Sequence, residues 1–288
     1  MKASELVLAP DRSLYHIRLT GSTLADKVLL VGDPGRVDMF KGIFENMEYE
    51  SHNREMHALT GCYHGVRMTA LSTGMGCDNI DIVMTELDAA LHLSDKSEWS
   101  DTSDRHLQLV RIGTSGSLQE DIDCGSHVAS CYAIGLDGLM NYYAEWRSPL
   151  PEMEQAFASH MQLDTRLAAP YCVGGSELLL DGIAFDMHQG ITATAPGFYG
   201  PQGRTVRLHP AIDNLNEKLS TFHSPAGLRI TNLEMETSAI YGFSHMLGHE
   251  ALTVCLIIAN RPRGTFLNDY HPQMCQLVGT VVERLATK

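Results

Sequence analysis

The chain has 288 residues, of which 44% are apolar, and it can therefore bury a large core. Its formal net charge of −14 argues against nucleic acid as a partner because a broad basic surface is missing, although a few arginines can still converge on a small anion. No apolar run approaches the ~20 residues that a membrane helix needs, and residues 1–5 lack the layout of a signal peptide. We therefore expect a cytoplasmic protein with no membrane partner.

Seven cysteines are scattered along the chain, and none of them belongs to a Cys-x-x-Cys pair. We expect reduced, mostly buried thiols, as in a reducing compartment. Cys62 and His64 stand close together in the sequence, but no matching second pair accompanies them, so they do not indicate a zinc site.

The first half of the chain reads as strands followed by a helix. Residues 27–31 predict a buried strand because four apolar residues follow Lys27, and residues 45–73 contain three extended segments separated by turn residues. Asp78 is placed to cap a helix whose apolar face consists of Ile80, Val83, Met84, Leu87 and Leu91. The polar segment 94–105 follows without periodicity. Because the apolar strand 107–110 comes directly after it, we expect a surface insertion and not a domain linker.

The second half continues the alternation of strands and helices. Apolar runs predict strands at 128–134 and 252–258, and helical patterns occur near 150–163 and 211–220. A last helix has an apolar face that consists of Met274, Leu277, Val278, Val281 and Leu285. The sequence contains no repeat and no low-complexity break. This pattern predicts one α/β domain over residues 1–288, with a central mixed β-sheet flanked by helices.

Residues 232–236 place two carboxylates, Glu234 and Glu236, on either side of Met235, where an apolar run changes into a helical pattern. Gly248 is placed to end that helix. Taken alone, acidic residues at this position are explained by the positive end of the helix dipole. A functional interpretation of them depends on the other segments of the chain.

Three glycine-containing segments stand at the ends of apolar strands. In residues 32–36, glycines allow backbone N–H groups to approach an anion and Arg36 supplies charge, with an ordinary Asp-Pro-Gly turn as the alternative. This segment lacks the ending of a Walker loop. Residues 72–76 begin like a dinucleotide fingerprint, but Asn79 stands where the third glycine is needed. Residues 111–117 bring a cation, hydroxyls and glycines to a strand end, and they lack the final glycine of a nucleophile elbow.

Residues 194–204 are expected to form a loop because of their proline and glycine content. Phe198, Gln202 and Arg204 put an aromatic ring, an amide and a guanidinium within seven residues. Such groups can stack on a flat heterocycle and hydrogen-bond its edge. For this loop in isolation, a proline-rich surface loop with an incidental arginine is the alternative.

Together these segments resemble the nucleoside phosphorylase family of the uridine phosphorylase type. The resemblance extends from residues 15–16 to residues 260–261, and the segments follow one another in the family's order. The resemblance implies a single α/β domain. The residues that it implies for phosphate are Gly32, Arg36, Arg54, Arg111 and Thr114. Those that it implies for the ribose are His16, Thr114, Glu234, Met235 and Glu236, and those for the base are Phe198, Gln202 and Arg204.

Particular roles follow from the same resemblance. Glu236 holds the 2′- and 3′-hydroxyls, and Gln202 and Arg204 read the polar edge of uracil. Arg54 and His16 are donated to the neighbouring subunit, to the phosphate and to the ribose 5′-hydroxyl respectively. A homodimer is therefore the implied functional unit, and a hexamer built as a trimer of dimers is the larger form. The residues expected to carry catalysis are Arg204, Gln202, Glu236 and Arg111.

The implied reaction is phosphorolysis of uridine to uracil and ribose 1-phosphate. Purine-specific relatives carry an aspartate after the strand equivalent to 252–258, whereas residues 257–261 contain no acid here. The reaction needs no metal or organic cofactor, because inorganic phosphate is a co-substrate. An alkali ion near Glu55 at the interface is left open. We expect Glu236→Ala to weaken nucleoside use far more than it weakens folding.

Three alternatives are weighed against this interpretation. The first is a purine nucleoside phosphorylase of the same fold, and the second is a nucleosidase that uses water. Retention of Arg36, Arg54 and Arg111 speaks against hydrolysis, which needs no phosphate clamp. The third is a non-catalytic nucleoside-binding protein, from which we would expect loss of Arg111, Glu236 or the phosphate loop.

Overall fold

The run predicted as a buried strand is β1 (Lys27–Val31) of the computed structural model. Successive side chains of a strand point to opposite faces of its sheet. Val28 and Leu30 accordingly belong to one apolar core, and Leu29 and Val31 to another. Helices must therefore cover both faces of the sheet around β1.

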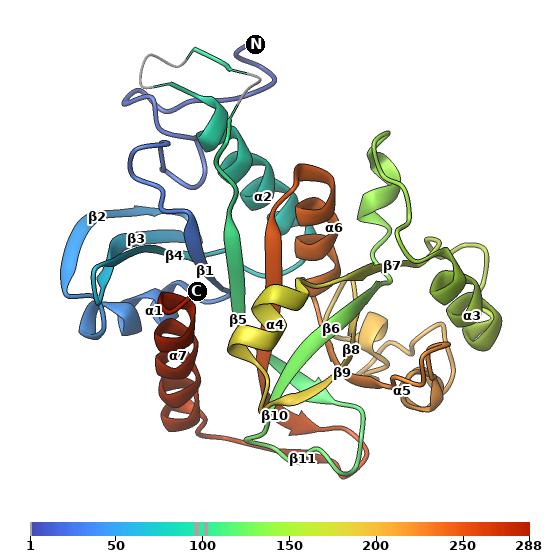
Figure 1. Ribbon diagram of the computed structural model, residues 1–288. Helices are drawn as coiled ribbons and strands as arrows, with labels where there is room; N and C mark the ends of the chain where they lie inside the picture. Colours follow the sequence, from blue (N-terminus) through green and yellow to red (C-terminus); the bar gives the residue numbers. More distant parts are fainter. Residues whose placement is uncertain (1, 95–97, 101–102) are drawn as a thin grey trace.

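The structure describes residues 2–94, 98–100 and 103–288 (Figure 1). The strands after β1 are β2 (Asn46–Asn53), β3 (Met56–Tyr63), β4 (Val66–Ser72), β5 (Gln108–Ser117), β6 (His127–Gly135), β7 (Tyr171–Gly174), β8 (His188–Thr194), β9 (Ile230–Glu234), β10 (Glu250–Asn260) and β11 (Thr265–Phe266). The helices are α1 (Pro34–Val37), α2 (Cys77–His92), α3 (Pro151–Met161), α4 (Glu177–Ile183), α5 (Leu215–Thr221), α6 (Thr237–Leu247) and α7 (His271–Ala286). Short 3₁₀ turns are η1 (Asp38–Gly42), η2 (Leu139–Tyr142) and η3 (Gly200–Gln202).

Strand β5 organises the sheet because it changes neighbours along its length. On one side it pairs in parallel with β10 from its first residue to its last. On the other side it pairs with β1 up to Arg111, and then with the antiparallel β9 from Gly116 onward. Strands β6 and β8 connect β10 back to β9, so five strands form a closed ring, and β4, β3 and β2 extend from β1 as an open wing. The predicted mixed sheet is confirmed. Its partial closure into a ring was not predicted from the sequence.

Helices cover this sheet in three groups. Helices α2 and α6 pack against each other and share the core that contains Val28. Helices α4 and α7 pack together over the core that contains Leu29, and the five apolar residues predicted for the last helix are all buried there. Helices α3 and α5 close a third core against β8 and β9. The prediction of helices flanking the sheet is therefore confirmed.

One local prediction is wrong. Asp78 does not cap α2, because the helix begins at Cys77 and its N-cap is Gly76, whose φ of +94° suits glycine. Asp78 lies in the first helical turn instead. Residues 111–117 close a strand as predicted, since β5 continues to Ser117 along its partner β10.

The segment 94–105 lies partly outside the described residues. Of the part that is described, Trp99 stacks on His92 with ring centroids 5.2 Å apart. The guanidinium of Arg105 donates to a carboxylate oxygen of Asp26 over 2.8 Å and to the carbonyl of Gly21 over 2.7 Å. All seven cysteines are free. Among the residues that the structure describes, no helix is long and apolar enough to cross a bilayer.

Candidate functional site

A cavity of about 930 Å³ opens where β5 exchanges β1 for β9. Between Arg111 and Gly116, none of the described strands pairs with this edge of β5. The segments that follow β1, β4, β8, β9 and β10 all line the cavity. Such a switch point at the carboxyl ends of strands is where α/β sheets bind ligands.

The cavity collects most of the residues that the sequence singled out. Its lining includes Gly32, Arg36, Arg111, Thr114, Phe198, Gln202, Arg204, Glu234, Met235 and Glu236. His16 and Arg54 do not line it. Segments that lie far apart in the sequence therefore meet at one place, and two of the predicted residues lie elsewhere.

A buried ion cluster forms the floor of the cavity. The guanidinium of Arg111 lies between two carboxylates, with its Nη1 atom 3.2 Å from Oε2 of Glu234 and its Nη2 atom paired with Oε2 of Glu236. All three side chains are buried. A Cβ at Gly113 would lie 2.2 Å from Nη1 of Arg111, so glycine is needed there to leave room for the guanidinium.

The protonation of this cluster is set by burial and by mutual attraction. Burial works to lower the pKa of Arg111, but the charges of Glu236 and Glu234 outweigh it and raise that pKa above its usual range. Burial raises the pKa of Glu236, and the charge of Arg111 opposes that rise. Arg111 therefore stays charged and depends on the carboxylates for compensation.

Glu234 and Glu236 have different hydrogen-bond partners within the cluster. The Glu234 carboxylate accepts hydrogen bonds from the backbone N–H groups of Glu236 and Thr237 over 3.0 Å, and from Oγ1 of Thr194 over 2.8 Å. It thus satisfies the N-terminus of α6 and ties the end of β9 to the end of β8. Glu236 accepts from the backbone N–H of Gly76 over 2.8 Å. Glu234 is the residue that complements the helix, and Glu236 has fewer partners.

Arginines gather on the β1 side of the cavity. Arg36, from the turn after β1, donates through Nη1 to the carbonyl of Ile112 over 3.2 Å. Burial lowers the pKa of Arg36, and the nearby charge of Arg111 contributes in the same direction. The Asp33 carboxylate accepts from the backbone N–H of Gly35 over 2.9 Å and so shapes the turn that presents Arg36. An anion bound here would relieve the repulsion between two converging guanidinium groups.

The loop after β8 is already assembled around Arg204. Its guanidinium lies 3.7 Å from the centroid of the Phe198 ring, and its Nη1 donates to Oε1 of Gln202 over 2.5 Å. Burial, and then the charge of Arg261, lower the pKa of Arg204 to about 10. Arg261 donates through Nη2 to the backbone carbonyl of Gln202 and fixes the loop to the end of β10. The aromatic, amide and guanidinium groups therefore lie together.

The segments that carry His16 and Arg54 are joined outside the cavity. The amide of Asn53 donates to the backbone carbonyls of Tyr15 and His16, over 2.9 Å and 3.0 Å, and so joins their two segments. Arg54 is exposed in the β2–β3 turn with a φ of +57°, a left-handed conformation that is costly for arginine.

Sequence reasoning missed residues that support the site. The Glu86 carboxylate accepts from Nδ1 of His16 over 2.6 Å and from the backbone N–H of Ile17 over 2.9 Å, and so holds the histidine. Glu86 lies within an apolar helical pattern, and no local signal marks it. Arg261 stands in the segment that carried the family resemblance, which could have identified it.

Comparison with known proteins places the chain in a family. The sequence model of the Phosphorylase superfamily matches residues 26–287. The chain is 29% identical over 252 residues to a uridine phosphorylase of Thermococcus kodakarensis, and the match covers 88% of this chain and 79% of the relative. It is 27% identical over 243 residues to a DeoD-type purine nucleoside phosphorylase of Alkaliphilus metalliredigens, covering 84% and 85% of the two chains.

A solved structure agrees with these sequence relatives. The structure is described as a Trypanosoma brucei nucleoside phosphorylase that shows uridine phosphorylase activity. It superposes with a TM-score of 0.88 at 29% identity, covering 98% of this chain and 100% of the other. The fold is thus that of an established enzyme family.

The buried ion pair revises what is expected of Glu236→Ala. Removing this carboxylate leaves the Arg111 charge buried and only partly compensated, so we expect a loss of about 3–5 kcal/mol in the free energy of unfolding. Urea denaturation followed by circular dichroism measures this loss. Glu120→Ala, at an exposed position, serves as the control and is expected to change little. Equal stability of Glu236→Ala and the wild type would show that Arg111 does not depend on Glu236.

Proposed function

The chain belongs to the Phosphorylase superfamily and is a nucleoside phosphorylase, and from this premise we propose that its nucleoside is uridine. The reaction would convert uridine and phosphate into uracil and ribose 1-phosphate. The observation that carries the proposal is the Gln202–Arg204 pair beside the Phe198 ring. An amide and a guanidinium offer donors to the two carbonyl groups of uracil, and the ring offers a stacking surface.

The end of β10 supports a pyrimidine. Asn260 lines the cavity, but its amide nitrogen donates to the carbonyls of Gln119 and Ile122, each over 2.9 Å. Its Oδ1 atom accepts from the backbone N–H of Arg263 over 3.0 Å. Both ends of this amide are therefore committed to the protein. A side chain held in this way does not supply the proton that a departing purine needs at N7.

The cavity offers a complementary group to each part of the reaction. We assign phosphate to the side of Gly32, Arg36 and Arg111, and the ribose to Met235, Glu236 and Thr114. Cleavage of the glycosidic bond builds positive charge on the ribose and negative charge on the leaving uracil. The carboxylates of the floor and the phosphate face the first charge, and Arg204 faces the second. Preorganised charges of this kind stabilise a transition state without reorganisation.

The proposed chemistry requires no metal or organic cofactor. Phosphate is ionised near neutral pH and attacks the anomeric carbon as the glycosidic bond breaks. The electron pair of that bond leaves with uracil, whose developing negative charge is stabilised by hydrogen bonds from Arg204 and Gln202. Proton uptake by the departing base then completes the exchange.

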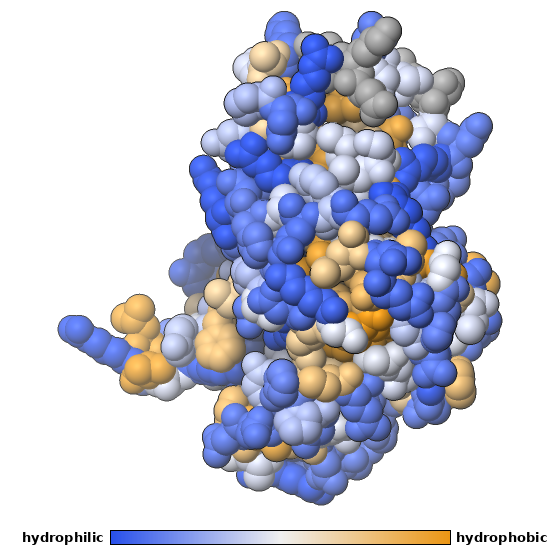
Figure 2. All heavy atoms as spheres, turned by 90° about the vertical axis from the view of Figure 1, so that its left-hand side faces the viewer, coloured by the Kyte–Doolittle hydropathy of each residue, from blue (hydrophilic) through white to orange (hydrophobic). Residues whose placement is uncertain are grey.

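We further propose that the working unit contains at least two copies of the chain. His16 and Arg54 lie outside their own cavity and are joined through Asn53, so one surface presents both of them. Figure 2 shows an apolar area within a largely hydrophilic face on the side where β2 lies. Met47 of β2 is 58% exposed. Exposed apolar surface of this kind suits contact with a second copy.

Release of free base tests the substrate directly. We expect the protein to release uracil from uridine only when phosphate is present, with ribose 1-phosphate as the second product, and chromatography of the products measures this. Faster release of hypoxanthine from inosine would assign a purine nucleoside instead. Release without phosphate would assign a hydrolase, and absence of turnover with any nucleoside would indicate a binding protein.

Arg204→Ala tests the base-reading loop. Loss of a preorganised donor to the leaving group typically costs about 3–4 kcal/mol, so we expect kcat for uridine to fall by a factor of about a hundred or more. Steady-state kinetics at saturating phosphate measures the fall. Arg207→Ala removes an exposed arginine of the same segment and should leave kcat nearly unchanged. Near-normal turnover of Arg204→Ala would remove this residue from the mechanism.

Mixed assemblies test the donation of Arg54. Arg54→Ala removes a residue that each subunit donates to its partner's site, whereas Arg204→Ala removes a residue of the subunit's own site. A mixed dimer of the two variants would therefore contain one intact site. Random pairing of equal amounts should therefore restore about a quarter of wild-type activity, although each variant alone has little. Co-expression with two different tags, followed by activity assay, measures the recovery.

The matched control combines two variants that damage the same half of the site. Arg204→Ala paired with Gln202→Ala leaves no intact site in any dimer, so no recovery is expected. If the Arg54→Ala and Arg204→Ala mixture shows no more than the summed activities of its components, Arg54 does not act across subunits.

A further inference from the structure

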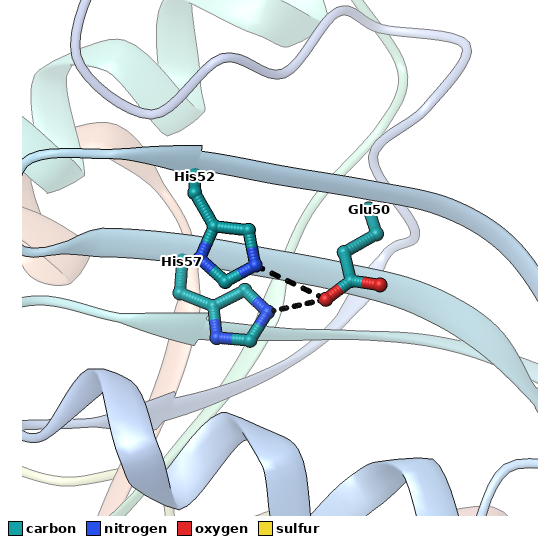
Figure 3. A group of neighbouring side chains, drawn as sticks. All are labelled: Glu50, His52 and His57. Carbon is teal, nitrogen blue, oxygen red and sulfur yellow. Dashed lines mark hydrogen bonds and ion pairs between the residues drawn. The ribbon is translucent and has the colours of Figure 1, made fainter.

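Three side chains that can ligate a metal ion meet on the open wing of the sheet, and none of them lines the nucleoside cavity. Glu50 and His52 belong to β2, and His57 to β3. Oε1 of Glu50 lies 2.9 Å from Nε2 of His57 and 3.1 Å from Nε2 of His52. Figure 3 shows the two imidazoles, one over the other, facing the carboxylate. Among the described residues, these three have ligand atoms within 4.8 Å of one another.

The tautomer of His57 is set by its other nitrogen. Nδ1 of His57 lies 3.1 Å from the carbonyl oxygen of Pro34, which can only accept a hydrogen bond, so Nδ1 carries the proton. In the neutral ring, Nε2 then directs a lone pair at the Glu50 carboxylate, which is itself an acceptor. The His57 side chain is only 2% exposed, whereas Glu50 is 36% exposed, so solvent reaches this contact from the carboxylate side alone. Two facing acceptors require a cation or a proton between them.

From this arrangement we propose a binding site for a divalent transition-metal ion, with Zn²⁺ as the representative, ligated by Glu50, His52 and His57. A tetrahedral Zn²⁺ has metal–nitrogen distances of about 2.0–2.1 Å, which places its ligand atoms roughly 3.3 Å apart. The observed separations of 2.9 Å and 3.1 Å from the Glu50 oxygen are close to this value. The two imidazoles are stacked with ring centroids 3.6 Å apart, so His52 must turn out of the stack to direct its Nε2 lone pair at the ion. His52 is 61% exposed and can do so, and water can take the fourth position.

The donor set selects the class of ion. Two imidazole nitrogens and one carboxylate oxygen suit Zn²⁺, Co²⁺, Ni²⁺ or Cu²⁺, whereas Ca²⁺ and Mg²⁺ prefer sites of six or more oxygens. The Pro34 carbonyl supplies the outer hydrogen bond that metal-bound histidines usually make, and it orients the ring before the ion arrives. The site is thus built from strands, with one ligand buried and fixed.

A lysine competes with the proposed ion. Nζ of Lys41 lies 2.7 Å from Oε1 of Glu50 and 2.9 Å from Oδ1 of Asp38. When a metal ion takes Glu50, this exposed side chain keeps Asp38 as its partner. Replacing Lys41 by an uncharged residue should therefore strengthen metal binding, which no merely structural role of the cluster would predict.

Calorimetric titration of the full chain with Zn²⁺, and visible absorption of the Co²⁺-loaded protein, test the site. We expect one ion per chain in the wild type. His52→Ala and Glu50→Gln each remove a ligand and should weaken binding by about a hundredfold or more, since loss of supporting contacts alone costs roughly 10–100-fold. Lys41→Met should tighten binding by about two- to fivefold, the worth of an exposed ion pair.

Two controls separate this site from adventitious binding. His64→Ala removes an exposed histidine that lies 3.5 Å from Glu45 in the same wing, and it should leave the affinity unchanged. His271→Ala tests the exposed Cys275–His271 pair of α7, whose atoms are 3.4 Å apart, and it should also leave one tight site. Unchanged affinity in both His52→Ala and Glu50→Gln, or loss of the tight site in either control, overturns the proposal. The outcome does not depend on which nucleoside the enzyme cleaves.

Discussion

One buried guanidinium, that of Arg111, lies between two buried carboxylates, and the cavity is assembled around it. The arginine comes from β5, Glu234 from the end of β9, and Glu236 from the start of α6. Glu236 also binds the backbone at Gly76, where α2 begins. Each charge would be costly to bury alone, so the elements that carry them must meet in one arrangement. The ion cluster thereby couples the ring of strands to the helices that cover it.

The same cluster has an electrostatic consequence for the chemistry. Arg111 and its two carboxylates form the cavity floor, Arg36 lies on the β1 side, and Arg204 and Arg261 also line the cavity. The cavity is therefore polarised, with anion-attracting groups beside a floor that presents carboxylates. A reaction that joins an anion to a sugar with developing positive charge suits that polarisation.

Sequence periodicity predicted the elements whose burial is regular, and it could not show which strands pair. Helix α7 has an unbroken apolar face, and β1 is apolar after its first residue, Lys27, so both were predicted. The seven-residue α4 contains Gly182 and is too short to display a period. Family resemblance brought Arg36, Arg204 and Glu236 to one site before any coordinates. Glu86 was missed because a hydrogen bond to His16, 70 residues away, leaves no local pattern.

Asn260 bears on how base preference can change between relatives. Its amide donates to two carbonyls of the turn after β5, those of Gln119 and Ile122. An aspartate in its place would set a carboxylate against two acceptor oxygens and lose both hydrogen bonds. An acid at this position therefore also calls for a different backbone at residues 119–122. Asn260→Asp alone would disturb the turn after β5 as well as the cavity.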